Sequence, residues 1–101
     1  MQIVYTRKAQ QDLQEICEYY EPRTPTGLQN IVNDIVNVVE DIPSTLSKGR
    51  STPHPEVWEK ITPKYKYLVP YYVFRGKLYI LRVYDPRRSE LDYLKIVDLE
   101  A

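Results

Sequence analysis

Cysteine and long apolar runs are nearly absent from this sequence, and each absence narrows what the protein can be. A single cysteine among 101 residues excludes an internal disulfide framework and suits a reducing compartment such as the cytoplasm. No apolar run approaches the ~20 residues of a membrane span. No charged-then-apolar leader begins the chain. We therefore expect neither a membrane-spanning segment nor a secretion signal.

Histidine is equally scarce. The single histidine, His54, stands between two prolines in a loop-like stretch, where such a side chain is usually solvated. No second histidine or suitable cysteine lies near it to complete a metal site, so we expect no metal and no cofactor.

Cys17 falls within an apolar helical stripe and has no activating neighbour in the sequence. It is predicted to be a small core residue and not a nucleophile.

Tyrosine is abundant, with ten against one phenylalanine and one tryptophan. It is favoured where a side chain must both pack and hydrogen-bond, as at interfaces. Charge is balanced in number, with 14 basic and 14 acidic residues, but not in position. The segment 60–88 holds many lysines and arginines against one acid, Asp85, whereas residues 1–41 are mainly acidic. Such an uneven distribution of charge attracts anionic partners to the positively charged region. The alternative is that these cations protect a solvated sheet edge from aggregation.

Residues 64–88 are predicted to form a central hairpin. Gly beside a polar residue, here Arg75-Gly76, signals a tight turn between two β-rich runs. A two-residue turn pairs Phe74 with Lys77, Tyr72 with Tyr79, Leu68 with Val83 and Tyr67 with Tyr84.

Strand alternation sorts the hairpin side chains onto two faces. The face expected to enter the core carries Leu68, Pro70, Tyr72, Phe74, Tyr79, Leu81 and Val83. The other carries Tyr65, Tyr67, Val69, Tyr71, Val73, Leu78, Ile80, Arg82 and Tyr84. This second face is too apolar to be fully exposed to solvent and too polar for a hydrophobic core that excludes water. It is therefore predicted to bind a partner.

Two helices are predicted before the hairpin. After a short strand over residues 2–5, Thr6 can cap a helix whose apolar residues recur at helical spacing up to Tyr20. A second helix begins with Thr24 as cap and Pro25 at its first position, and Pro43 ends it. The link between the helices is short, which indicates an antiparallel helical hairpin.

The remaining segments complete the predicted fold. Residues 44–55 are rich in turn formers and predict a loop, and a strand over 57–61 precedes the hairpin. Ser89 can cap a short C-terminal helix, with a strand over 95–99 as the alternative. A helical hairpin packed on a mostly antiparallel sheet is an α+β, two-layer domain, here spanning residues 1–101. The first strand is expected to pair near the last long strand.

Several segments follow one another in an order and spacing that resemble a known family. They are YTRKAQQDLQEICEYY at the start, Pro43 after the second helix, Gly49-Arg50 in the loop, then VWEKI and YLVPYYVFRGKLYILRVYDPRR. Together they resemble the RelE/ParE superfamily of bacterial toxins from type II toxin–antitoxin systems. The resemblance implies a cytoplasmic toxin neutralised by a small, acidic, partly disordered antitoxin encoded beside it. It also allows a higher-order toxin–antitoxin complex.

Two branches of this superfamily remain open. RelE-like members cut mRNA in the ribosome with a cluster of Lys and Arg and a general base, whereas ParE-like members poison DNA gyrase without a comparable catalytic set. RNA cleavage by 2′-hydroxyl attack needs a base, cations for the phosphorane and an acid for the leaving oxygen. If this chain is a nuclease, the candidates are Glu59, Lys64, Lys66, Arg82, Tyr84, Arg88 and Tyr93.

The ParE-like branch is favoured because the helical hairpin is long, the ILRVYDPRR ending is generic, and the tyrosine of RSELDY is one residue out of step with RelE-like toxins. Target binding is then expected at Arg82, Tyr84, Arg87 and Arg88. Antitoxin binding is expected at Tyr65, Tyr67, Val69, Tyr71 and Ile80. Two alternatives remain: a toxin-like domain that only binds its antitoxin, and a purely structural Arg82 paired with an acid of the C-terminal helix.

Overall fold

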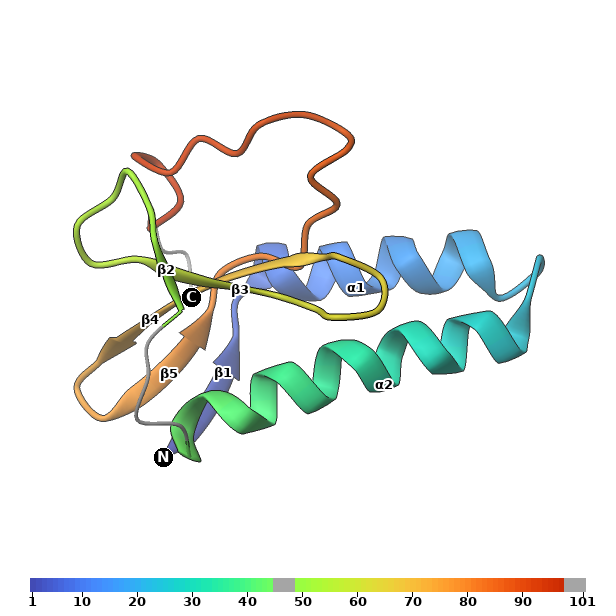
Figure 1. Ribbon diagram of the computed structural model, residues 1–101, viewed down its shortest axis with the longest axis horizontal. Coiled ribbons are helices and arrows are strands. Elements are labelled where there is room, and N and C mark those ends of the chain that lie inside the picture. Colours follow the sequence, from blue (N-terminus) through green and yellow to red (C-terminus); the bar gives the residue numbers. More distant parts are fainter. Residues whose placement is uncertain (45–48, 98–101) are drawn as a thin grey trace.

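The computed structural model describes residues 1–44 and 49–97. Its elements run in the order β1 (Gln2–Tyr5), α1 (Arg7–Tyr20), α2 (Pro25–Asp41), the 3₁₀ helix η1 (Ile42–Ser44), β2 (Arg50–Ser51), β3 (Trp58–Ile61), β4 (Leu68–Phe74) and β5 (Lys77–Ile80). Figure 1 shows α1 and α2 side by side and the segment after β5 looping away from them. The predicted α+β arrangement is confirmed. Among the described residues, no helix has the length and apolar character needed to cross a bilayer.

Both helices begin at their predicted caps. The hydroxyl of Thr6 accepts from the Ala9 amide at 3.2 Å, which satisfies one of the donors that the first helical turn leaves free. The same hydroxyl donates to the Leu81 carbonyl at 3.0 Å, so the start of α1 is tied to the end of the hairpin. Thr24 caps α2 in the same way, and Pro25 is its first residue.

Five strands form one sheet in the order β1-β5-β4-β3-β2. β1 runs parallel to β5, while the other neighbours are antiparallel. The first strand therefore lies beside the last long strand, as predicted. β2 has only two residues and lies within a stretch predicted to be loop throughout. So short a strand has no periodicity to reveal it in the sequence.

The β4–β5 hairpin has the predicted two-residue turn. Arg75 and Gly76 have φ angles of 50° and 76°, the left-handed pair that a type I′ turn requires. Phe74 pairs with Lys77 across the turn, which confirms the predicted register at this end.

A bulge changes the register at the other end of the hairpin. Tyr71 pairs with Ile80, but Leu68 pairs with Tyr84, so three steps along β4 match four steps along the opposite chain. The predicted pairing of Leu68 with Val83 is therefore wrong by one residue, because an extra residue is inserted after β5. The insertion brings Val83 into the same buried cluster as Ile80.

Burial contradicts the role predicted for one of the two sheet faces. Val69 and Ile80 are fully buried, and Tyr67 and Tyr71 nearly so, in a cluster with the apolar residues of α1 and α2. Tyr65 packs against the same cluster. The face predicted to bind a partner is therefore the main core. Alternation separates two sets of side chains without saying which set the helices cover, and here both sets are largely apolar.

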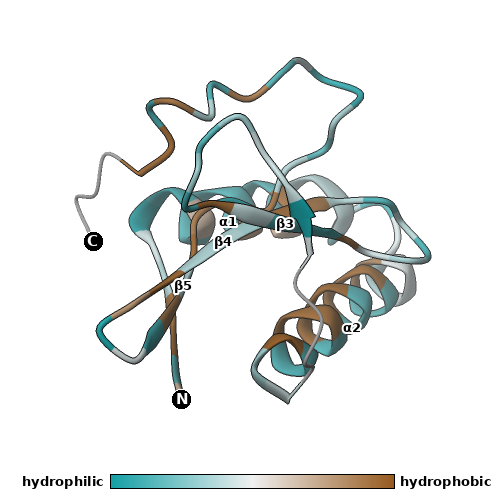
Figure 2. Ribbon diagram, turned by 60° about the vertical axis from the view of Figure 1, so that its left-hand side comes forward, coloured by the Kyte–Doolittle hydropathy of each residue, from teal (hydrophilic) through white to brown (hydrophobic). Residues whose placement is uncertain are grey.

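The opposite face is covered by the C-terminal segment. Val57, Tyr72 and Leu81 form a second buried cluster, and apolar residues between Tyr93 and Val97 pack against it. Figure 2 shows this segment on the side of the sheet away from α2. Tyr72 and Leu81 are thus buried as predicted, but by a different partner. Phe74, also predicted for the core, is 46% exposed.

The short C-terminal helix predicted after Ser89 is not formed in the described residues. Residues 89–97 run as turns and irregular chain, and the hydroxyl of Ser89 hydrogen-bonds to that of Tyr84 instead of capping a helix. The alternative strand over 95–99 lies partly outside the described residues, and residues 95–97 form a turn. This segment is held by the packing of its apolar side chains on the sheet, and not by helical hydrogen bonds.

Candidate functional site

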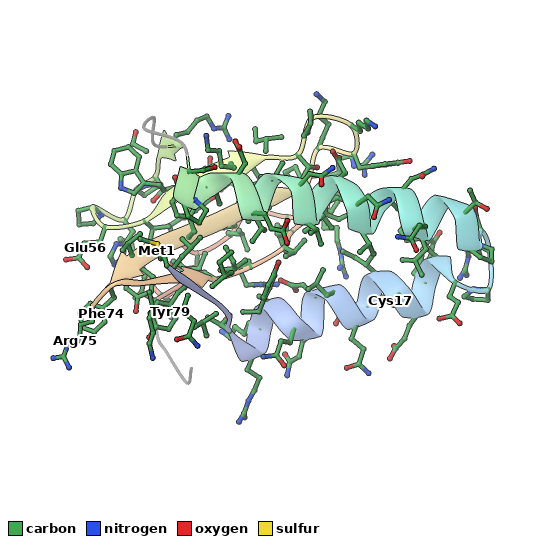
Figure 3. All side chains as sticks on the ribbon, turned by 90° about the horizontal axis from the view of Figure 1, so that it is seen from below. Met1, Cys17, Glu56, Phe74, Arg75 and Tyr79 are labelled. Carbon is green, nitrogen blue, oxygen red and sulfur yellow. The ribbon has the colours of Figure 1, made fainter. Side chains whose placement is uncertain are left out.

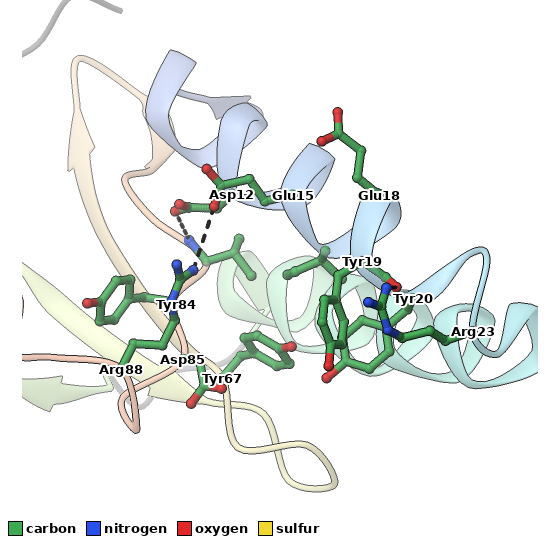
Figure 4. Close-up of a pocket in the computed structure, with 12 residues that line it drawn as sticks. Asp12, Glu15, Glu18, Tyr19, Tyr20, Arg23, Tyr67, Tyr84, Asp85 and Arg88 are labelled. Atoms are coloured by element: carbon green, nitrogen blue, oxygen red, sulfur yellow. Dashed lines mark hydrogen bonds and ion pairs between the residues drawn. The ribbon is translucent and has the colours of Figure 1, made fainter.

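A surface groove lies between α1 and the segment that follows β5 (Figure 4). Its volume is about 720 Å³. Four tyrosines, two arginines and four carboxylates contribute to its lining: Tyr19, Tyr20, Tyr67, Tyr84, Arg23, Arg88, Asp12, Glu15, Glu18 and Asp85. The groove therefore offers a partner aromatic surface and charges of both signs.

A bidentate ion pair joins the hairpin end to α1 at one end of this groove. Arg82 donates to Asp12 from Nε at 2.7 Å and from Nη2 at 2.9 Å, and the Val83 amide donates to the same carboxylate at 3.0 Å. Pairing of this geometry is strong and directional, and the hydrogen bonds that Arg82 donates to Asp12 raise the pKa of Arg82. Arg82, predicted to bind a target, is therefore held by its own chain, with its side chain 23% exposed.

The turn after the hairpin is ordered by a second ion pair. Arg87 donates from Nε and Nη2 to the two carboxylate oxygens of Asp85, each at 2.9 Å. This hydrogen bonding lowers the pKa of Asp85. The Arg87 amide donates to the same carboxylate at 2.9 Å, so the pair fixes the backbone as well as the side chain.

Three of the four predicted target-binding residues come together. Arg82, Tyr84 and Arg88 line one hollow of about 530 Å³ beside α1, and the Arg82 guanidinium lies 5.0 Å from the centre of the Tyr84 ring. Arg88 reaches Glu15 at 3.6 Å, and both side chains are mostly exposed. Arg87 does not line this hollow and is paired with its neighbour instead. Arg88 is thus the least firmly paired of the three cations.

An aromatic cluster at the end of α1 builds another part of the groove. The Arg23 guanidinium lies 4.0 Å from the centre of the Tyr19 ring, and that ring meets Tyr20 edge-on at 4.8 Å. Burial, and secondarily Tyr20, raises the pKa of Tyr67, which borders the same groove. Tyr67 therefore stays a neutral phenol, offering a partner hydrogen bonds and not charge.

Sequence reasoning missed Tyr19, Tyr20 and Arg23 as site residues. A signal was present, because adjacent residues of a helix point about 100° apart. Two neighbouring tyrosines at the end of an amphipathic helix therefore cannot both face the core. Tyr19 is indeed 54% exposed.

Comparison with protein families shows which family the chain belongs to. Residues 3–90 match the family described as ParE toxin of type II toxin-antitoxin system, parDE. This chain belongs to the ParE toxin family. Among solved structures, it is similar to a chain of the chromosomal ParDE TA system from P. aeruginosa. The two share 28% sequence identity with a TM-score of 0.71, and the match covers 82% of this chain and 92% of that chain. A comparison with curated proteins finds no match.

In this ParE-family toxin, two of the nuclease candidates bind each other away from the groove. The Tyr93 hydroxyl donates to one carboxylate oxygen of Glu59, and Arg50 Nη2 donates to the other at 2.6 Å. Burial and then the hydrogen bond to Glu59 raise the pKa of Tyr93. A general base needs a lowered tyrosine pKa, so Tyr93 is shifted in the unfavourable direction.

The two lysine candidates lie in the turn between β3 and β4, where both are exposed. The buried carboxylate of Asp34, from α2, accepts from the Lys64 amide at 3.1 Å and from the Tyr65 amide at 2.9 Å. Lys66 has a left-handed φ of 63°. The turn is therefore anchored to α2 through its backbone. Within residues 1–44 and 49–97, no group of three His, Cys, Asp or Glu side chains is arranged to hold a metal ion.

Proposed function

We propose that this toxin arrests bacterial growth in the cytoplasm by binding DNA gyrase, and that a cognate antitoxin neutralises it. Membership of the ParE toxin family supports the toxin role. The observation that favours binding over RNA cleavage is the contact between Glu59 and Tyr93. It pairs two of the three acid–base candidates, Glu59 and Tyr93, with each other on the face under the C-terminal segment, whereas the third, Tyr84, lines the hollow beside α1 with Arg82 and Arg88.

The hollow beside α1 is the proposed gyrase-binding surface, with Arg88 and Tyr84 as the contacts. The pair between Arg88 and Glu15 is long and exposed, and such pairs contribute little. The Arg88 guanidinium is therefore free to exchange Glu15 for an acidic group of the target. Arg82 acts as a positioning residue, because it holds the hairpin end against α1.

The tyrosine-lined groove is the proposed antitoxin site. Of the residues predicted for this role, Tyr67 lines the groove, while Val69 and Ile80 lie under the helices. An amphipathic antitoxin segment that folds on binding suits this groove. Its apolar side would pack on the tyrosine rings and its acidic groups would meet Arg23 and Arg88. A stable complex of this kind is expected to bury at least ~1,500 Å² in total.

A gyrase assay with three variants tests the proposed target. We expect the purified toxin to inhibit supercoiling and Arg88→Ala to weaken inhibition about fivefold, as the loss of one exposed charge contact of about 1 kcal/mol implies. Lys95→Ala, which removes another exposed cation, is the matched control. Tyr93→Phe should inhibit as the parent does. Codon-positioned mRNA cuts with unaffected supercoiling, and loss of growth arrest in Tyr93→Phe, would instead assign a ribosome-dependent nuclease.

Co-expression with the adjacent reading frame tests neutralisation. We expect a short acidic protein encoded there to restore growth and to co-purify with the toxin. The double variant Tyr19→Ala/Arg23→Ala should reduce that rescue, because it removes the exposed cation–aromatic pair of the groove. Recovery of the chain alone, with no harm to cells that express it, would count against both parts of the proposal.

A further inference from the structure

The tip of the β4–β5 hairpin carries apolar side chains in water. Val73 and Phe74 are 53% and 46% exposed, although the four residues before them in β4 are buried. Figure 3 shows Phe74 and Arg75 at the outer end of the hairpin. Neither residue belongs to the groove or to the hollow beside α1, so the exposure calls for a separate explanation.

Phe74 is the exposed end of an aromatic row. Its ring stacks on Tyr72 with centroids 6.2 Å apart and planes at 22°, and Tyr72 in turn meets Tyr79 at 5.3 Å. Tyr72 is nearly fully buried, so its ring is fixed by packing, while Phe74 remains partly exposed to solvent. The result is an aromatic platform held in a fixed orientation.

Two unpaired cations flank this platform. The Arg75 guanidinium lies 5.1 Å from the centre of the Phe74 ring, and Lys77 is directly opposite Phe74 in the strand register. Neither cation forms an ion pair with any residue that the structure describes, in contrast to Arg82 and Arg87. The tip therefore presents two cations beside an aromatic ring, and Glu56, whose charge acts on Tyr72 at the base of the row, forms no ion pair with either of them among the described residues.

Arg75 is also an unusual residue for its position. It has a φ of 50° in the first place of a type I′ turn, where Asn, Asp or Gly fits without steric conflict. A residue held in a disfavoured backbone conformation points to a use for its side chain. Here that side chain supplies one of the two cations of the tip.

We propose that the hairpin tip binds a single strand of nucleic acid. One base stacks on Phe74, while Arg75 and Lys77 contact neighbouring phosphates. Stacking and phosphate contacts need little area, whereas a stable protein partner needs roughly 800 Å² from each side, and this tip consists of residues 73–77 alone. The choice of DNA as the strand rests on the proposed function, because gyrase acts on DNA.

A titration of the ¹⁵N-labelled toxin with a single-stranded DNA oligonucleotide at low salt tests this inference. We expect chemical-shift changes centred on residues 73–77. The logarithm of the affinity should fall with the logarithm of salt concentration with a slope of about −1.4, as two phosphate contacts imply for a single strand. Shift changes confined to other parts of the chain would overturn the proposal.

Substitutions at Phe74 separate stacking from apolar docking. Phe74→Ala and Phe74→Leu should both weaken binding about tenfold, since neither keeps a π-face, and Phe74→Trp should retain it. Leu94→Ala is the matched control because Leu94 is 74% exposed and lies outside the tip. If Phe74→Leu binds as the parent does, the tip docks by apolar contact and the nucleic-acid proposal fails.

Arg75→Asn separates binding from folding. Asn suits the left-handed turn position better than Arg, so this variant should bind the oligonucleotide more weakly and melt at a temperature no lower than the parent. A supercoiling assay of the parent toxin runs in parallel. Gyrase inhibition without oligonucleotide binding at the tip would defeat this inference and leave the proposed function standing. Binding at the tip without gyrase inhibition would support this inference and contradict the proposed function.

Discussion

Replacing Asp12 by alanine is expected to lower the free energy of unfolding by about 2–4 kcal/mol. The change removes the acceptor of three donors, two from Arg82 and one from the amide of Val83. A buried donor left without a partner costs about 1–3 kcal/mol, and Val83 is only 2% exposed. Breaking a buried ion pair costs about 3–5 kcal/mol. The expected loss is smaller than the sum of these two costs because 23% of the Arg82 side chain is exposed to water.

Arg82→Met is expected to cost less, about 1–2 kcal/mol. This change keeps most of the side-chain volume, and Asp12 keeps its hydrogen bond from the Val83 amide. Because the two residues share one interaction, the double variant Asp12→Ala/Arg82→Met should cost less than the sum of the single changes, by about 1–2 kcal/mol.

Urea denaturation of the single and double variants measures these differences, with an unchanged m-value as the check that only stability has changed. The melting temperature of Asp12→Ala should fall by at least about 8 °C. Glu15→Ala, which removes only the exposed contact with Arg88, is the control and should change stability by less than about 0.5 kcal/mol. Equal losses for Asp12→Ala and Glu15→Ala, or additive losses in the double variant, would refute the reasoning.

Three further predictions concern other parts of the fold. The pKa values of Tyr67 and Tyr93 are raised in the folded state, so the unfolded chain loses these protons first and stability should fall as pH rises above about 10; urea midpoints at about pH 8 and about pH 10.5 measure this, and equal midpoints would contradict it. Asp34→Ala leaves two turn amides without their acceptor and should cost about 2 kcal/mol in the same assay, whereas Asp34→Asn should cost less. Gly49→Ala places a Cβ 2.1 Å from the Glu59 carbonyl oxygen, so the melting temperature should fall, by the equivalent of about 1–3 kcal/mol; an unchanged melting temperature would show that the edge strand yields freely.

Local features of the fold were predictable from the sequence because each depends on residues a few positions apart. Thr6 and Thr24 cap their helices through amides three residues away, and the Arg75-Gly76 turn follows from the conformations that a tight hairpin requires. The family was also recognisable, since its likeness rests on the order and spacing of such local segments. Three of the four residues predicted to bind a target, Arg82, Tyr84 and Arg88, line one hollow, and their role in target binding stays a prediction.

Only the tertiary structure decided which sheet face became the main core. Alternation defined two apolar sets, and packing of α1 and α2 on one of them buried Val69 and Ile80, which had been predicted to bind a partner. The bulge after β5 and the pairing of Arg82 with Asp12, 70 positions apart in the chain, have no local signature. Contacts between distant residues depend on how whole elements pack, because each side chain binds whichever group the assembled fold brings within reach. Here that fold holds one predicted site residue by its own helix and leaves Phe74 and Arg75 in solvent at the hairpin tip.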